Sequence, residues 1–248
     1  MRASDPKILI LGGTTEAAAL ATAFAGLPVN AITSLAGRTS NPAKLTGTVR
    51  SGGFGGVDGL AAYLDEERID LIIDATHPYA ARISQNAMQA AGKRSISLVR
   101  LERPAWEEKP GDRWINISDE AEAVNAIPSG ESVFLALGRQ HIAPFAERAD
   151  VYFIIRMIDP PDVTLPQDCE IVLARPGDYA AEKRFLENHR IGLIVSRNSG
   201  GTISYAKIEA ARALGLPVMM ISRPPVAARN VVTSPEEAII FARKALGF

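Results

Sequence analysis

The stretch from Lys7 to Ala17 constrains the fold of this chain more than any other. Four apolar residues, Ile8 to Leu11, predict a buried parallel strand; two glycines then predict a sharp turn, and an alanine-rich segment predicts a helix. In a doubly wound α/β sheet, such a turn directs backbone N–H groups and a helix N-terminus at a phosphate. A plain strand–turn–helix corner is the alternative, because Thr14 replaces the middle glycine of the usual fingerprint.

The residues after the second expected strand indicate which dinucleotide the turn would hold. The strand expected over residues 29–34 is followed by Gly37 and Arg38, with hydroxyls at Thr39 and Ser40 and no acidic residue. An acid there would bind the ribose 2′-hydroxyl of NAD, whereas an arginine suits the 2′-phosphate of NADP. The sequence therefore predicts NADPH/NADP as the cofactor.

Strands and helices alternate along the whole chain, which predicts an α/β protein. We expect two Rossmann-like doubly wound domains with mainly parallel sheets and an interdomain cleft. Pro128-Ser129-Gly130 is interpreted as the linker, so residues 1–128 form an NADP-binding domain and residues 129–248 a domain that completes the cleft. The expected strands are 8–11, 29–34, 48–50, 71–74, 96–99, 114–117, 133–137, 151–155, 171–174, 193–196 and 218–221. The expected helices are 15–25, 57–67, 79–91, 119–126, 178–189, 204–214 and 235–245.

Composition narrows the classes of partner. The net charge of −1 gives no global basic field for nucleic acid or an anionic membrane. No run of 18 apolar residues is present, so we expect no membrane partner. The single cysteine, Cys169, excludes an internal disulfide and fits a reducing cytoplasm. We expect a cytoplasmic protein that is a monomer or a small homo-oligomer.

Arginines follow one expected strand after another in the second half of the chain. They are Arg139, Arg156, Arg175, Arg197 and Arg223, and Arg38 and Arg50 hold equivalent places in the first half. Ligands of open α/β sheets bind at the carboxyl ends of the strands. The pattern predicts a cationic site for a ligand with several carboxylates or phosphates. Salt bridges within loops are the alternative.

Two further clusters follow expected strands in the first half. Four glycines surround Phe54 within residues 52–56, where the backbone can approach a flat ligand that Phe54 would cover; a flexible turn is the alternative. Asp74 and Thr76 would point at the ligand-binding edge, and His77 or Tyr79 is a candidate proton donor. A capping network that orders the next helix is the alternative for this second cluster.

The second half carries its own glycine turn. Asn198, Ser199, Gly200 and Gly201 lie between an expected strand and an expected helix, and Lys207 falls on the first turn of that helix. A cation is unfavourable there unless an anion lies beside it. A solvated surface lysine is the alternative.

No Walker A lysine is present, and the three scattered histidines and one cysteine give no zinc spacing, so we expect no metal.

Several of these motifs occur together and in the order found in one enzyme family. The order runs from Gly12-Gly13-Thr14-Thr15-Glu16-Ala17 through Gly37-Arg38, Gly53-Phe54-Gly55 and Asp74-Ala75-Thr76-His77-Pro78-Tyr79-Ala80 to Asn198-Ser199-Gly200-Gly201 and Lys207. It resembles the precorrin-6A reductase family of cobalamin (vitamin B12) biosynthesis, including its cobalt-precorrin counterpart. The resemblance covers nearly the whole chain, and the Asp74–Ala80 string is its most specific element.

The resemblance implies an NADPH-dependent oxidoreductase that reduces one double bond of a tetrapyrrole, precorrin-6A, to give precorrin-6B. It places Gly12, Gly13, Thr14, Thr15, Glu16, Gly37, Arg38, Gly53, Phe54 and Gly55 against the cofactor, and Asp74, Thr76 and His77 near its nicotinamide. Asn198 to Gly201 and Lys207 would lie where cofactor and substrate meet. His77, Tyr79 and Lys207 are the catalytic candidates, and the five arginines of the second half would bind substrate carboxylates.

Three alternatives stay open at this point. The substrate is either metal-free or already contains cobalt. Another NADP enzyme of the same architecture would reduce a small ketone or imine, which does not explain the strand-end arginines. A non-catalytic NADP- or tetrapyrrole-binding module would keep the glycine loops without turnover. Neighbouring pathway enzymes are the only protein partners that the resemblance brings in.

Overall fold

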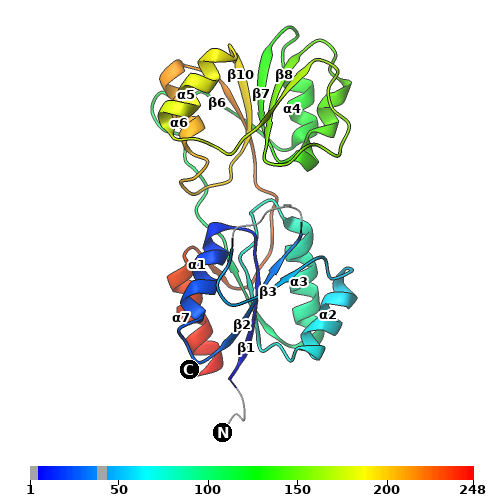
Figure 1. Cartoon of the computed structure of the whole chain (residues 1–248), viewed down its shortest axis with the longest axis vertical. Coiled ribbons are helices and arrows are strands. Elements are labelled where there is room, and N and C mark those ends of the chain that lie inside the picture. The colour runs from blue at the N-terminus through cyan, green and yellow to red at the C-terminus, as the bar shows by residue number, and fades with distance from the viewer. Residues whose placement is uncertain (1–4, 38–43) are drawn as a thin grey trace. The chain divides into compact units, whose positions relative to one another are not determined.

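The computed structural model describes residues 5–37 and 44–248, and these form two compact α/β units (Figure 1). Unit 1 comprises the residues up to Pro104 together with Pro224–Phe248, and unit 2 comprises Ala105–Arg223. Each unit contains one six-stranded sheet, and every strand pair in both sheets is parallel. The predicted class of two α/β domains with parallel sheets is confirmed.

The sheet of unit 1 has the order β12-β5-β4-β1-β2-β3. Its strands are β1 (Lys7–Leu11), β2 (Asn30–Leu35), β3 (Thr48–Ser51), β4 (Leu71–Asp74), β5 (Ser97–Leu101) and β12 (Val231–Val232). Its helices are α1 (Thr15–Phe24), α2 (Val57–Glu66), α3 (Ala81–Arg94) and α7 (Pro235–Leu246). Helices α1 and α7 cover one face of the sheet, and α2 and α3 cover the other (Figure 1).

The sheet of unit 2 has the order β6-β11-β10-β7-β8-β9. Its strands are β6 (Trp114–Ile117), β7 (Ser132–Ala136), β8 (Tyr152–Met157), β9 (Cys169–Leu173), β10 (Leu193–Arg197) and β11 (Val218–Ile221). Its helices are α4 (Glu120–Ala126), α5 (Tyr179–Asn188) and α6 (Ala206–Leu214), with two 3₁₀ turns, η1 (Arg139–His141) and η2 (Ala143–Glu147).

Unit 1 takes its edge strand, the exchanged strand β12, from the far end of the chain, whereas unit 2 is one continuous segment. Strand β6 precedes β7 in sequence but pairs with β11 at the edge of the second sheet. Strand β12 follows β11 but pairs with β5 in the first sheet, and α7 after it packs on the core of unit 1. Both sheets thereby reach the six-strand order of a dinucleotide-binding fold.

The domain boundary in the structure therefore differs from the one expected at residues 128 and 129. Pro128-Ser129-Gly130 is the short turn between α4 and β7 rather than a linker. Gly130 has a φ of 79°, and its N–H donates to Asp150 O at 2.7 Å. The chain instead passes between the units after Pro104 and before Pro224, where proline interrupts regular structure.

The ends of the elements follow local physical rules. Thr14, Asp119, Asp178 and Ser234 cap α1, α4, α5 and α7 through their side chains, each accepting from a backbone N–H three residues on. Helix α3 begins at Ala81 instead of Tyr79. Residues His77–Ala80 form a turn closed by Ala80 N–H donating to His77 O at 2.8 Å, with Pro78 in its second position.

Candidate active site

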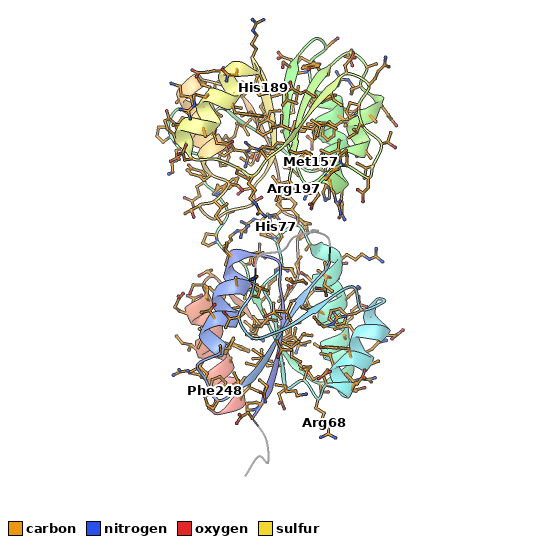
Figure 2. The ribbon with its side chains drawn as sticks, in the orientation of Figure 1. Arg68, His77, Met157, His189, Arg197 and Phe248 are labelled. Carbon is orange, nitrogen blue, oxygen red and sulfur yellow. The ribbon has the colours of Figure 1, made fainter. Side chains whose placement is uncertain are left out.

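The carboxyl ends of the strands in unit 1 bring its predicted site residues to one edge of the sheet. The loops after β1, β4 and β5 line a small pocket there, which is formed by Thr14, Glu16, Ala75, Thr76, Pro78, Leu101 and Arg103. Its volume of about 10 Å³ takes one water-sized group. His77 lies at this edge, and Arg68 lies at the opposite edge of the same unit (Figure 2).

The glycine turn after β1 packs closely against β2 and α1. Gly12 lies so near Thr33 and Ala17 that an added Cβ would come within 3.0 Å and 3.3 Å of their side chains. Gly13 has a φ of 108°, which side chains disfavour. The turn thus leads directly into the N-terminus of α1, where orphan backbone N–H groups favour an anion.

The threonines of this turn have different roles. Thr14 Oγ1 accepts from Ala17 N and donates to Ala75 O at 2.7 Å, so its hydroxyl proton is engaged within the protein. Thr15 is exposed and donates to Glu16 Oε2 at 3.1 Å, a contact that a bound anion can replace.

Glu16 pairs with an arginine that the sequence analysis missed. Arg103 Nη1 lies 2.8 Å from Glu16 Oε2. Burial raises the pKa of Glu16, but the residue's own backbone N–H and Arg103 outweigh it and hold the pKa below its ordinary value. The strand-end rule applied to the other arginines also selects Arg103, which follows β5 by two residues.

Two glycine segments meet beside β2 and β3. Gly37 has a φ of 70°, and a Cβ on it would come within 3.6 Å of Gly52 N. Arg50 donates to the carbonyls of Gly52 and Gly53, and its guanidinium lies 3.9 Å from the ring centroid of Phe54. Gly53 and Gly55 have open space where a Cβ would be, as a close-fitting ligand requires.

The Phe54 ring packs against side chains of its own unit. Arg50 covers one face, and Tyr63 packs edge-on at 5.2 Å between centroids. Its contribution is to hold the glycine loop on α2. Arg38, the predicted ligand of a 2′-phosphate, lies outside the described residues.

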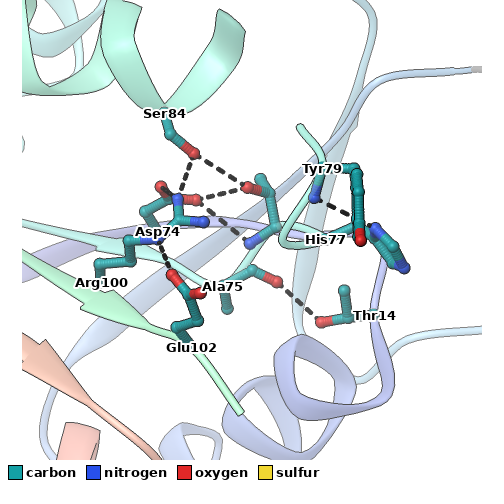
Figure 3. Close-up of polar contacts among 9 residues, drawn as sticks. Thr14, Asp74, Ala75, His77, Tyr79, Ser84, Arg100 and Glu102 are labelled. Carbon is teal, nitrogen blue, oxygen red and sulfur yellow. Dashed lines mark hydrogen bonds and ion pairs between the residues drawn. The ribbon is translucent and has the colours of Figure 1, made fainter. Parts of the chain in front are cut away.

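A buried polar network supports the loop after β4 (Figure 3). Asp74 is 1% exposed; its Oδ1 accepts from the backbone N–H and hydroxyl of Thr76 at 3.1 Å and 2.7 Å, and its Oδ2 pairs with Arg100 at 2.9 Å. Both carboxylate oxygens of Asp74 are thus engaged within the protein, and they order the residues that lead to α3, whose N-terminus has no side-chain cap.

His77 and Tyr79 lie on the turn above this network. The backbone N–H of Tyr79 donates to His77 Nδ1 at 3.4 Å, and their rings lie 5.7 Å apart (Figure 3). A neutral His77 that accepts at Nδ1 carries its proton on Nε2. Both residues are half-buried, and the turn presents the His77 ring at the carboxyl edge of the sheet.

In unit 2, the parallel sheet places all five predicted arginines at its carboxyl edge, but most contact groups of the same unit. Arg156 forms a buried two-point pair with Glu182 at 2.7 Å and 2.9 Å, and Arg197 Nη2 lies 2.8 Å from Glu120. Arg223 Nε donates to Asn198 O at 2.8 Å, Arg139 lies 3.8 Å from Asp162, and Arg175 is exposed. The salt-bridge alternative is therefore correct for Arg156, whose guanidinium is committed to a carboxylate that is 1% exposed.

The acid partner of Arg197 is strongly stabilised as an anion. His141 Nδ1 lies 2.9 Å from Glu120 Oε1. The hydrogen bond from His141, together with Arg197 and against the effect of burial, lowers the pKa of Glu120 to about 2. This cluster holds α4, η1 and the end of β10 together. Arg197 lies at the end of β10, and His189 lies at the opposite edge of unit 2 (Figure 2).

The glycine turn of unit 2 is ordered by a residue that the sequence analysis also missed, Trp106. Asn198 accepts from Trp106 N at 2.7 Å and donates to Trp106 O at 2.9 Å, while the indole N–H donates to Gly201 O at 2.7 Å. The Asn198 side chain is thereby engaged with the backbone. Gly200 and Gly201 both have positive φ, and Ser199 N–H donates to Arg197 O.

Lys207 is not a surface lysine. It is 5% exposed, its Nζ donates to Ser204 O at 2.8 Å, and it lies 4.9 Å from the centroid of the Trp106 ring. Burial lowers the pKa of Lys207 to about 7; Arg156 acts in the same direction, and Glu182 opposes it. A lysine in this state can give or take a proton near neutrality.

Neither a metal-binding cluster nor a membrane-spanning helix is found in the part of the chain that the structure describes. No cluster of three His, Cys, Asp or Glu side chains there has the geometry of a metal site. Within residues 5–37 and 44–248, no helix combines the length and apolar character needed to cross a membrane.

Comparison with known proteins gives a consistent result. The model of the precorrin-6x reductase CbiJ/CobK family matches residues 7–243. A precorrin-6A reductase from Rhodococcus erythropolis is 50% identical over 223 residues, covering 89% of this chain and 90% of that protein. One from Rhodobacter capsulatus is 42% identical over 233 residues, covering 93% of each. A solved structure described as CobK precorrin-6A reductase is 40% identical, covers 97% of each chain and superimposes with a TM-score of 0.92.

The match extends over both units and includes β6 and β12 within its span. It also includes every described loop at the carboxyl edges of the two sheets. The chain therefore belongs to the precorrin-6x reductase family.

Proposed function

We propose that this protein uses NADPH to reduce one carbon–carbon double bond in the macrocycle of precorrin-6A, giving precorrin-6B. The observation that carries the proposal is the arrangement of loops at the carboxyl edge of unit 1. There the glycine turn and α1 N-terminus lie beside the loop that holds Thr76 and His77. The family and the reductase activity of its members supply the reaction class.

The residues of unit 1 fit a dinucleotide. Gly12 lets α1 pack closely against β2, Gly13 leaves open space where a diphosphate would approach the backbone, and the N–H groups of Thr15 and Glu16 lie at the helix terminus. Gly37 and Arg38 would hold the adenosine end, with Arg38 on the 2′-phosphate. Thr76 and His77 would lie beside the nicotinamide. When bound, the dinucleotide supplies the hydride.

The protein's own contribution is alignment. A near-attack distance of about 3–3.5 Å between donor and acceptor carbons accounts for much of the rate of such a step. Precorrin-6A gains a hydride at one carbon and a proton at its neighbour, and NADPH leaves as NADP⁺. His77 Nε2, Tyr79 or Lys207 is the proposed proton source, and water takes that role if their removal leaves the rate unchanged.

The residues of unit 2 would bind the carboxylates of the substrate. Arg175, Arg197 and Arg223 are the proposed contacts, with Arg139 beside them on η1. Arg156 is reassigned as the support of Glu182 and α5. Arginine forms two-point contacts with carboxylates, and a substrate with many acetate and propionate groups needs several of them. The lone cysteine fits the reducing cytoplasm in which we expect the enzyme to work.

A steady-state assay tests the proposal. Precorrin-6A should drive the oxidation of NADPH in a ratio of one to one, and NADH should support a much lower rate. A parallel reaction with cobalt-precorrin-6A decides whether the metal-free macrocycle is preferred, as the names of the relatives suggest. Tight binding of both ligands without oxidation of NADPH would instead indicate a non-catalytic binding module.

A further inference from the structure

A buried group of charges lies directly beneath the loop that carries Thr76 and His77. The Asp74 and Arg100 side chains are each 2% exposed, and Glu102 is 27% exposed. Arg100 donates from Nη1 to Asp74 Oδ2 at 2.9 Å and from Nε to Glu102 Oε2 at 2.7 Å (Figure 3). These residues lie at the carboxyl ends of β4 and β5, the two strands next to β1 on one side of the sheet.

A stability role alone does not explain this arrangement. Removing charges from water costs about as much as the pair gains, and well-packed apolar residues often stabilise a fold as well or better. In the best-attested cases, a buried charged group specifies one geometry of its surroundings instead of adding stability. The contacts of Arg100 indicate which geometry is specified here.

Arg100 connects both ends of the loop formed by residues 75–80. At the β4 end it pairs with Asp74, whose other oxygen accepts from Thr76 N and Thr76 Oγ1. At the α3 end Arg100 Nη1 donates to Ser84 Oγ, which lies 3.3 Å from Thr76 Oγ1. The guanidinium thus contacts residues at both ends of the loop, Asp74 at the end of β4 and Ser84 in α3.

The same network extends to the glycine turn and to the exchanged strand. Ala75 O accepts from Thr14 Oγ1, the cap of α1, at 2.7 Å. The backbone N–H groups of Arg100 and Glu102 donate to Asn230 O and Val232 O on and before β12, at 2.9 Å and 2.8 Å. One chain of contacts therefore joins the β1–α1 turn, the β4–α3 loop and the strand contributed from the far end of the sequence.

We propose that Arg100 is a positioning residue for the hydride-transfer step, acting through Asp74 and Thr76 on the loop that bears His77. This inference rests on the proposed function of unit 1. A displacement of about 1 Å at the reacting atoms is sufficient to lower turnover about 100-fold. Loss of Arg100 should therefore reduce kcat more than it changes the KM for the tetrapyrrole, whose proposed contacts lie in unit 2.

The experiment compares Arg100→Met, Arg100→Lys and the double variant Asp74→Asn/Arg100→Met with the wild-type protein. In the double variant, the side-chain amide introduced by Asp74→Asn keeps an oxygen for Thr76 while removing the unpaired charge, so thermal stability should recover. Arg148→Met is the matched control. Arg148 is 17% exposed, pairs with Asp150 and donates to the carbonyls of Val124 and Ile127. It precedes β8 and so lies at the amino edge of the second sheet, opposite the edge that bears the proposed ligand contacts. All kinetics are measured at temperatures where each variant is folded.

Positioning predicts that kcat falls about 100-fold in Arg100→Met and remains low in the double variant. Arg100→Lys should recover part of the rate, because it restores the charge without the two-sided geometry. The deuterium isotope effect on kcat from 4-deuterated NADPH should increase as the hydride step becomes limiting. Arg148→Met should lower the melting temperature and leave kcat unchanged.

A second readout needs neither cofactor nor substrate. Hydrogen exchange of the amides of residues 75–80 should accelerate about tenfold in Arg100→Met and in the double variant, and not in Arg148→Met. Recovery of kcat together with stability in the double variant, or unchanged exchange in this loop, would overturn the inference. A wild-type protein that fails to oxidise NADPH would instead overturn the proposed function, and the exchange result would still decide the role of Arg100 in the loop.

Discussion

At the scale of single residues, the site depends on charges held in unusual surroundings. Lys207 is buried against Trp106 with a pKa near 7, and Glu16 and Arg103 neutralise each other beside the α1 N-terminus. Such groups cost stability and are expected where function requires them. Substitutions at single residues, with stability, ligand binding and kinetics measured for each variant, distinguish residues that bind ligands from residues that only stabilise the fold.

Lys207→Met should change how stability depends on pH. The folded pKa of about 7 lies below the ordinary 10.5, so between these values the unfolded chain holds a proton that the folded chain lacks. Stability of the wild type should therefore rise as pH increases from about 7 to about 10.5. Urea unfolding should show that the variant loses this rise and is more stable at pH 7.

The control for that experiment is Lys244→Met, an exposed lysine on α7. Its pH profile should follow the wild type. If the Lys207→Met and wild-type profiles run parallel across this range, Lys207 keeps its proton in the folded protein and the argument for its proton-transfer role fails.

Arg38→Ala should weaken NADPH binding far more than NADH binding. A guanidinium on the 2′-phosphate contributes a charge-assisted contact worth about 1.5–3 kcal/mol, which corresponds to about a 10- to 100-fold change in Kd. Titration of both dinucleotides measures it. An equal loss for the two would remove Arg38 from the 2′-phosphate.

Arg223→Ala should raise the KM for the tetrapyrrole about tenfold and leave the KM for NADPH close to that of the wild type. Steady-state kinetics with each substrate varied in turn make the comparison. Arg184→Ala, on the exposed side of α5, is the control for a general loss of positive charge. A KM for the tetrapyrrole that stays at the wild-type value would take Arg223 out of the substrate site.

At the scale of elements, two helical glycines differ in whether the glycine loop around Phe54 packs against them. Gly59 in α2 lies under the carbonyl of Phe54, which an added Cβ would clash with, whereas Gly92 in α3 faces open space. Gly59→Ala should lower stability by about 1–3 kcal/mol and displace the glycine loop. Gly92→Ala should raise stability by about 0.5–1 kcal/mol.

Denaturant unfolding and NADPH titration test the pair together. We expect Gly59→Ala to weaken NADPH binding and Gly92→Ala to leave it unchanged. If both substitutions stabilise the protein, α2 is not held against the Phe54 loop as the structure shows.

Most elements could be predicted from the sequence because their signals are local. Apolar runs such as Leu71–Ile73 and caps such as Asp178 mark strands and helices within a few residues. Strand β12 was missed because Val231-Val232 is too short to form a periodic pattern. Its pairing with β5, 131 residues earlier in register, leaves no trace in local sequence.

The site was predictable to the same extent. The strand-end rule assigned the predicted residues to the carboxyl edges of both sheets, and the structure places the described ones there. It did not distinguish guanidiniums that meet an acid of the same unit, such as Arg156 with Glu182, from those available to a ligand. Arg100 and Trp106 act through partners that are far away in sequence, and only the tertiary structure reveals them.

At the scale of the whole molecule, the return of β12 and α7 to the first sheet makes the folding of unit 1 depend on both ends of the chain, whereas unit 2 is one continuous segment. A chain that ends at residue 223 lacks β12 and α7, whose Ala238, Ala242 and Leu246 complete one core of unit 1. Circular dichroism and thermal unfolding should show that unit 1 is lost in this truncated chain while unit 2 remains folded.

A fusion of residues 5–104 to residues 224–248 is the matched control, since it contains all six strands of the first sheet. It should fold and bind NADPH. If the truncated chain unfolds in one step with the stability of the full protein, the exchanged strand does not contribute to unit 1.

The central claim is that a hydride passes from a nicotinamide held at the carboxyl edge of unit 1 to the tetrapyrrole macrocycle. Its most direct test is a single turnover with precorrin-6A and NADPH stereospecifically deuterated at C4, followed by mass spectrometry of the product. The account predicts that one of the two deuterated epimers transfers one deuterium to a carbon of each precorrin-6B molecule. Product formed from both epimers without deuterium would contradict it.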